Sequence, residues 1–408
     1  MSVKSQNLVR TTLPGWCGLG GFFFSIWVLH FTNDEPYIKA AITIGSIFMV
    51  MFCAEVFLCI RGNFGLIAAP SQRRIDVRRV LFKISGLIIT VLCLSSIYWV
   101  FYGYYNHLYK PYFQALAVGW PYLAAFFIFC IVWSDQRSDE HEDANYWIAY
   151  AVFNFKFKLL KNTNLKQHIL EWLIKIYFLP LMFVALADHV NFYFNINNAC
   201  ASYNTFCGFI FFIDTAFASV GYLFANNLTD THVRSADPTL LGWACTLICY
   251  DPFWTLFGAK FLSYGSAWGL WFYFRPALQI IWAVLIGLCL TLYVWATISF
   301  GTRFSNLTHR GILTGGPYAY MRHPAYIGKM CSFFLIYVPF MGTNIIVILR
   351  NCFLWGLLGG IYYLRAKTEE ANLRSMGPEY DIYATEVRQN WKKLLRFENL
   401  LFTRRYFM

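Results

Sequence analysis

Long apolar segments alternate with short polar segments along most of the chain. A helix needs about 20 mainly apolar residues to cross the roughly 30 Å hydrocarbon core of a bilayer. Runs of this kind occur at 16–31, 38–60, 81–101, 112–133, 170–190, 208–226, 239–258 and 277–299, and two shorter runs follow at 325–341 and 345–364. The pattern predicts an all-α polytopic membrane protein with about ten spans.

The last two apolar runs are separated only by Phe340-Met-Gly-Thr-Asn344. Such a short connection predicts an antiparallel helical hairpin. We therefore divide the chain into an N-terminal multi-span membrane domain, 1–276, and a C-terminal core, 277–408, that contains the hairpin and an amphipathic tail.

Composition and charge agree with a membrane protein. Hydrophobic residues make up 58% of the chain and charged residues 13%, against about 25% charged residues in soluble domains. The net charge of +12 comes from basic residues gathered in short stretches between apolar runs. Membrane orientation explains these stretches better than nucleic-acid binding, so no nucleic-acid partner is predicted.

The basic stretches predict the orientation of the chain. The loop from Arg61 to Lys83 is strongly basic and contains a single acidic residue, Asp76. The segments 134–169 and 300–324 and the tail after Arg365 are also basic, and alternation of the spans places them all on one side. By the positive-inside rule this side is cytoplasmic, and both termini lie there. The end of 134–169 and the tail are expected to form helices at the membrane edge or against the ends of the spans.

Several kinds of chemistry find no support in the sequence. The eight histidines never lie within five residues of each other, as a membrane di-iron site requires, and no metal site is predicted. The chain has no GxxxxGK[ST] phosphate loop. Asp214 and Glu55 lie inside apolar runs and are the main support for a transporter as an alternative function.

The densest polar cluster is the segment GILTGGPYAYMRHPAYIG, residues 311–328. Gly315-Gly316-Pro317 predicts a turn, and Pro324 suits the first turn of the following helix. His323 then lies near the helix amino terminus, where unpaired N–H groups and the helix dipole favour a carboxylate. Arg322 and the neighbouring tyrosines add further donors to the same place.

A second polar cluster follows the hairpin. The segment RAKTEEANLRSMGPEYDIY, residues 365–383, returns to the side of the first cluster. Arg365 and Glu369 are four residues apart and share one face of a helix. We expect the two clusters to form one site.

The two clusters and the hairpin between them resemble the C-terminal core of the isoprenylcysteine carboxyl methyltransferase family, integral membrane enzymes that use S-adenosylmethionine. The resemblance covers roughly 300–395, about a quarter of the chain. It implies a methyltransferase core whose catalytic residues are Arg365, which faces the methyl acceptor, and Arg322. The cofactor contacts that it implies are Gly311, Ile312, Leu313, Tyr318, His323, Pro324, Tyr326, Glu369 and Glu370.

The chemistry of S-adenosylmethionine suits this allocation. His323 and the helix amino terminus can bind its carboxylate, Glu369 its ammonium, and a tyrosine ring its adenine or sulfonium. A carboxylate acceptor is already ionised at neutral pH, so the site mainly has to align the reacting atoms.

The acceptor stays open between a prenylated cysteine, another membrane lipid and an amine head group. We expect a lipid or lipidated small substrate that enters from the bilayer. The runner-up, ahead of the transporter, is an oxidoreductase similar to the sterol reductases, which binds NADPH. Arg303, His309 and Arg310 could contact its phosphates.

Overall fold

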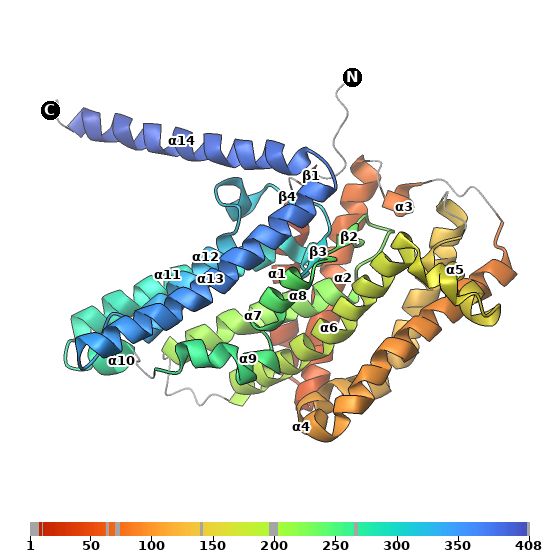
Figure 1. The fold of residues 1–408 in the computed structure, drawn as a ribbon, viewed down its shortest axis with the longest axis horizontal. Coiled ribbons are helices and arrows are strands. Elements are labelled where there is room, and N and C mark those ends of the chain that lie inside the picture. Colours follow the sequence, from red (N-terminus) through yellow and green to blue (C-terminus); the bar gives the residue numbers. More distant parts are fainter. Residues whose placement is uncertain are drawn as a thin grey trace.

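The computed structural model describes residues 8–9, 11–62, 65–69, 74–138, 142–195, 203–264 and 268–405. Nearly all of its regular structure is helical (Figure 1). The long helices are α1 (Leu13–Leu29), α2 (Pro36–Gly62), α4 (Val77–Arg137), α6 (Thr163–Asn195), α7 (Tyr203–Leu223), α11 (Pro276–Phe300), α12 (Pro324–Tyr337), α13 (Ile345–Ser375) and α14 (Glu379–Arg405). The short elements are α3 (Gly65–Ala68), α5 (Ala144–Phe153), η1 (Phe157–Lys161), α8 (Leu240–Leu247), α9 (Phe253–Leu256), η2 (Gly258–Leu262), α10 (Trp268–Trp271), η3 (Gly301–Arg303), η4 (Gly316–Ala319) and the two-residue strands β1 (Leu8–Val9), β2 (Ser235–Ala236), β3 (Thr308–His309) and β4 (Ile312–Leu313).

Within the described residues, seven helical segments are long and apolar enough to cross a membrane. They are 36–62, 77–98, 108–137, 163–195, 203–223, 276–303 and 345–375. Helices α1 and α12 have 17 and 14 residues, fewer than the roughly 20 that a span needs. The chain is thus a multi-pass helical membrane protein.

The predicted span at 239–258 is wrong as a single helix. Three short elements, α8, α9 and η2, take its place. Helix α8 ends before Pro252, which lacks an N–H group and disfavours helical geometry at the residue before it. Apolar composition alone does not reveal this interruption.

Helix α4 is helical over 61 residues, yet it contributes two spans. Arg79 and Asp135, near its two ends, form an ion pair with a nitrogen–oxygen distance of 2.7 Å. In a straight helix, residues so far apart in sequence would be separated by about 80 Å. The helix therefore folds back into two arms, 77–98 and 108–137, as the hydropathy pattern predicts.

The predicted hairpin of α12 and α13 is present. The rings of Phe334 and Trp355 lie 5.0 Å apart and those of Tyr326 and Tyr362 5.5 Å apart, which is the pairing of antiparallel helices. The Asn344 side chain accepts a 3.0 Å hydrogen bond from the backbone N–H of Val347 and caps α13.

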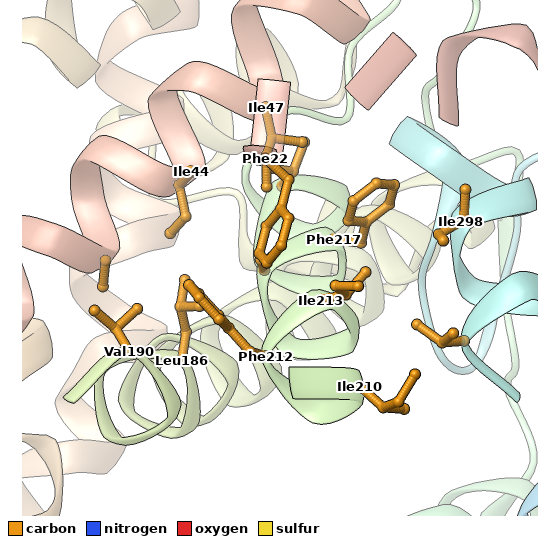
Figure 2. Packing of buried hydrophobic residues seen from close by; sticks show 14 of the residues in the cluster. Phe22, Ile44, Ile47, Leu186, Val190, Ile210, Phe212, Ile213, Phe217 and Ile298 are labelled. Carbon is orange, nitrogen blue, oxygen red and sulfur yellow. The ribbon is translucent and has the colours of Figure 1, made fainter. Parts of the chain in front are cut away.

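The main apolar core joins α1, α2, α6, α7 and α11 (Figure 2). Phe22, Ile47, Leu186, Phe212 and Ile298 are all buried in it. Packing of this kind is a principal source of helix association in membranes, where the hydrophobic effect between helices is weak. The core therefore contains side chains from both parts into which the sequence analysis divides the chain, 1–276 and 277–408.

Loops that the charge pattern places on one side of the membrane lie together at one end of the helices. The Arg137 guanidinium bonds to the carbonyl of Ala69, the Ile67 N–H to that of Leu228, and the Arg303 guanidinium to that of Asp230. We call this region, formed by 65–69, 134–138, 227–231 and 303–313, the loop end. Strand β1 also lies there, paired with β4.

The two segments expected at the membrane edge differ in structure. The stretch after α5 forms a turn and the short helix η1. Helix α5 ends with Asn154 as its cap, and the positive φ of Phe155, 53°, prevents the helix from continuing. The tail forms α14, whose first turns pack Tyr380, Tyr383 and Val387 against Ile312 at the loop end.

We expect Gly15→Ala to destabilise the protein, because a Cβ at this position would lie 1.8 Å from the carbonyl oxygen of Ile298 in α11. The displaced backbone should cost about 1–3 kcal/mol and lower the melting temperature in detergent. Gly20→Ala in the same helix is the control, because its Cβ would meet nothing within 4 Å. Equal melting temperatures for the two variants would contradict the close packing of α1 on α11.

Candidate functional site

The segment between α11 and α12 is held in place at several points. Gly301 ends α11 with a φ of 53°, and Gly311 and Gly316 also have positive φ values, which a glycine adopts without a steric penalty. Strand β3 pairs with β2, and β4 pairs with β1. These ties hold the first polar cluster at the loop end.

Two buried arginines anchor the same segment. The Arg303 Nη1 atom lies 2.8 Å from Glu55 Oε1 in α2. Arg310 donates to the carbonyl oxygens of Thr231, Gly221 and Phe304 at 2.8–2.9 Å. Burial, followed by the nearby Arg303 cation, lowers the pKa of Arg310 to about 9.

The start of α12 faces the end of α13. The His323 Nε2 atom lies 3.1 Å from Glu370 Oε1, and its ring is stacked on Tyr326 at 5.5 Å. The Tyr326 hydroxyl donates to Glu369. The His323 Nδ1 atom lies 3.8 Å from the other oxygen of Glu369. The hairpin thus brings the two polar clusters into direct contact.

Glu370 is the most heavily neutralised carboxylate of the site. Its side chain is only 2% exposed and lies within 2.9–3.7 Å of the cationic groups of Arg322, Lys367 and Arg374, in addition to His323. Its oxygens are therefore already occupied by protein partners. Its position indicates that it holds Arg322 and His323 in place.

Arg365 is buried between aromatic rings. Its guanidinium carbon lies 4.9 Å from the ring centre of Tyr326 and 5.6 Å from that of Tyr250. It donates to the side-chain oxygen of Asn306, and its Nε atom is 3.7 Å from Glu369. The Arg365–Glu369 contact at four-residue spacing is the one that the sequence predicts.

A cavity of about 150 Å³ lies between these side chains. Most of the sequence-predicted site residues line it: Gly311, Ile312, Leu313, Tyr318, Arg322, His323, Tyr326, Arg365 and Glu369. Pro324 and Glu370 are not among its lining residues, although each is next in sequence to a residue that lines it. The Tyr318 ring packs on Phe300 at 4.9 Å, and the Tyr318 carbonyl accepts a 2.9 Å hydrogen bond from Tyr383.

Sequence reasoning missed several lining residues, some close to the predicted clusters in sequence and others from distant segments. Asn306, Tyr250, Tyr293 and Lys329 all line the cavity. Lys329 could have been predicted from the sequence, because a lysine inside the apolar run 325–341 is a candidate functional residue. Asn306 and Tyr250 offered no such signal, since only the folded chain places them beside Arg365.

The acidic residues that supported a transporter have protein partners. Asp214 accepts hydrogen bonds from Tyr293 at 2.5 Å and from Thr297 at 2.6 Å. Glu55 binds Arg303 and accepts a 2.7 Å bond from Thr302. Both carboxylates thereby link α2 and α7 to the end of α11, next to the candidate site.

Comparisons with models of protein families, with curated protein sequences and with solved structures found no match to this chain.

We expect Glu370→Ala to destabilise the loop end, because it leaves several cations without their shared carboxylate. Removing one partner of such a buried group costs about 1–3 kcal/mol, which a lower melting temperature would report. Glu386→Ala on the exposed face of α14 is the control. A melting temperature unchanged in both variants would show that the ion cluster does not hold α12 on α13.

Acid should destabilise the loop end through His309, which is 1% exposed. Burial, followed by the Arg234 cation, lowers its pKa to about 4. The unfolded chain binds this proton near pH 6.5, so up to about 3 kcal/mol of stability is lost as the pH falls from about 6.5 to 4. His309→Phe should reduce the difference in melting temperature between about pH 7 and pH 5. His30→Phe, at an exposed histidine, should leave that difference at the wild-type value.

Proposed function

We propose that the chain is an S-adenosylmethionine-dependent methyltransferase of the isoprenylcysteine carboxyl methyltransferase type. The observation that supports this best is the convergence of His323, Tyr326, Arg365 and Glu369 on one cavity, from two sequence clusters joined by a hairpin. Each of these residues stands at the position that the resemblance assigns to the site.

The donor set suits the chemical groups of the cofactor. Glu369, whose side chain is 29% exposed, is accessible to an ammonium group. His323 lies at the amino terminus of α12, where a carboxylate is favoured. The rings of Tyr318 and Tyr326 are apolar surfaces for adenine or a sulfonium. These residues would hold S-adenosylmethionine, which supplies an electrophilic methyl group when bound.

The cavity is smaller than the roughly 300–1,000 Å³ of most small-molecule pockets. Glu369 in its wall contacts both Tyr326 and His323, which line it as well. Binding of a nucleoside-sized ligand therefore requires Glu369 to exchange its contact with Tyr326 for one with the ligand. Conformational change of a site on ligand binding is common in enzymes.

Arg365 is the residue we assign to the methyl acceptor. Its burial among aromatic rings leaves Nε without a hydrogen-bond acceptor within the described part of the chain. A guanidinium in this setting can hold an acceptor carboxylate in one orientation. The carboxylate oxygen would bond to the methyl carbon, while the carbon–sulfur electron pair leaves with sulfur, so no general base is needed. We place Arg322 beside it, held by Glu370.

We propose that the acceptor is a lipid or lipidated small molecule that reaches the site from the bilayer. The site lies where the membrane-length helices α11 and α13 end, so a molecule already in the membrane can approach between helices. The basic loops at the same end support a cytoplasmic location of the site.

A second candidate function, an NADPH-dependent oxidoreductase, is favoured by a different observation. Arg303 and Arg310 both line the cavity, and Arg303 Nε and Arg310 Nη2 have no hydrogen-bond partner within the described residues. Each guanidinium keeps its contacts with Glu55 or with backbone carbonyls, and its remaining N–H group could donate to a phosphate oxygen. His309 does not line the cavity and does not strengthen this alternative.

Calorimetric titration of the purified protein with S-adenosylhomocysteine and, separately, with NADPH tests both functions. We expect S-adenosylhomocysteine to bind. Glu369→Gln should weaken this binding by about ten- to a hundred-fold, since a charge-assisted hydrogen bond contributes about 1.5–3 kcal/mol. Glu386→Gln, remote from the cavity, should bind like the wild type.

The other outcomes reject the proposal. Tight binding of NADPH without S-adenosylhomocysteine would establish the oxidoreductase alternative. Binding of neither ligand would leave the transporter as the remaining function. Equal affinity of wild type and Glu369→Gln for S-adenosylhomocysteine would place the cofactor elsewhere.

A further inference from the structure

A second, much larger cavity lies between the two arms of α4 and helix α6. Its volume is about 990 Å³, at the upper end of the range for small-molecule pockets. Apolar side chains such as Leu87, Val91, Leu123, Phe127 and Leu179 form most of its wall. A space of this volume is large enough for a small molecule or part of a lipid chain.

The polar groups around this cavity are mostly satisfied by the protein. The Tyr98 hydroxyl donates a 2.5 Å hydrogen bond to the carbonyl of Ile176, and Lys175 forms a 2.5 Å ion pair with Glu171. Lys110 and Gln114 have exposed side chains. The enclosed surface that is left is apolar, which favours a hydrocarbon chain over a polar ligand.

The cavity is open toward the outside of the helices. Trp120 and Phe113 line it, and their side chains are 60% and 38% exposed. Both belong to a segment of membrane-spanning length. The opening therefore faces the region that lipid occupies, and a lipid chain can enter sideways without crossing water.

A hydrogen-bonded pair, Tyr222 and Asn306, links the wall of this cavity to the wall of the candidate site. Tyr222 lines the large cavity, and its hydroxyl accepts hydrogen bonds from the backbone N–H of Asn306 at 3.0 Å and from its side-chain nitrogen at 2.6 Å. The side-chain oxygen of Asn306 accepts from Arg365, and both residues line the smaller cavity. Tyr222 is 1% exposed, so an amphiphile that occupies both cavities must displace the Tyr222–Asn306 contact to pass from one to the other.

We infer that the cavity between α4 and α6 binds the hydrocarbon chain of the lipid acceptor, whose reactive head group lies at Arg365. This inference rests on the proposed methyltransferase function, and it gives the N-terminal helices a role in binding substrate. Part of the acceptor's affinity then comes from helices that precede the catalytic cluster.

Photolabelling of the full chain tests the inference. The protein is placed in phosphatidylcholine vesicles that contain phosphatidylcholine with a diazirine near the end of one acyl chain. We expect cross-links on cavity residues such as Leu87, Val91 and Leu179. Ala117→Trp, which fills the cavity from its wall, should reduce these cross-links at least ten-fold. Val118→Trp is the matched control, because Val118 is 64% exposed and does not line the cavity.

Methyl transfer provides the second readout. With radiolabelled S-adenosylmethionine and a membrane lipid extract, Ala117→Trp should lower the transfer to lipid at least ten-fold, while Val118→Trp retains it. Both variants should bind S-adenosylhomocysteine like the wild type. Equal cross-linking in the two variants would overturn the inference, and so would lost cross-linking with unchanged transfer, which would indicate a structural lipid. Failure of the wild type to bind S-adenosylhomocysteine would instead reject the proposed function.

A second pair of variants serves if Ala117→Trp does not fold. Ser95→Trp fills the cavity from the other arm of α4, and Leu92→Trp, at an exposed position outside the lining, is its control. We expect the cross-links to fall at least ten-fold in Ser95→Trp and to be retained in Leu92→Trp. Equal cross-linking of these two variants would overturn the inference.

Discussion

The ion pair between Glu55 and Arg303 joins the two halves of this protein. Glu55 comes from α2 and Arg303 from the end of α11, and both side chains are buried. Burial of either charge alone would be strongly unfavourable, so the two helices must meet at this level. The carbonyl of Asp230 also accepts from Arg303, which adds the segment after α7 to the same contact.

The other contacts of the loop end add to the Glu55–Arg303 ion pair. Arg310 ties the segment after α11 to the end of α7 through backbone carbonyls, and the paired strands β2 and β3 continue the contact. With this segment held, α12 begins at a defined place, and the hairpin returns α13 to it. The cluster around Glu370 then closes the contact between α12 and α13.

The two cavities differ in the chemical character of their walls. The smaller one is lined by arginines, a carboxylate and tyrosines, and the larger one is mainly apolar. Tyr222 and Asn306 form a hydrogen-bonded link between the two walls. Under the proposed function, an amphiphilic acceptor would use both cavities, whereas a water-soluble acceptor would use only the smaller one.

The sequence alone determined the helical membrane architecture, the hairpin, the two arms of α4 and the proximity of the two polar clusters. These follow from hydropathy, loop length and helical spacing, all of which are local properties of the chain. Only the tertiary structure decided that the run 239–258 is broken, that Asn306 and Tyr250 contact Arg365, and that a large cavity lies between α4 and α6. Such contacts join residues from distant segments, and their formation depends on packing and on the pairing of buried charges, which leave no periodic pattern in the sequence.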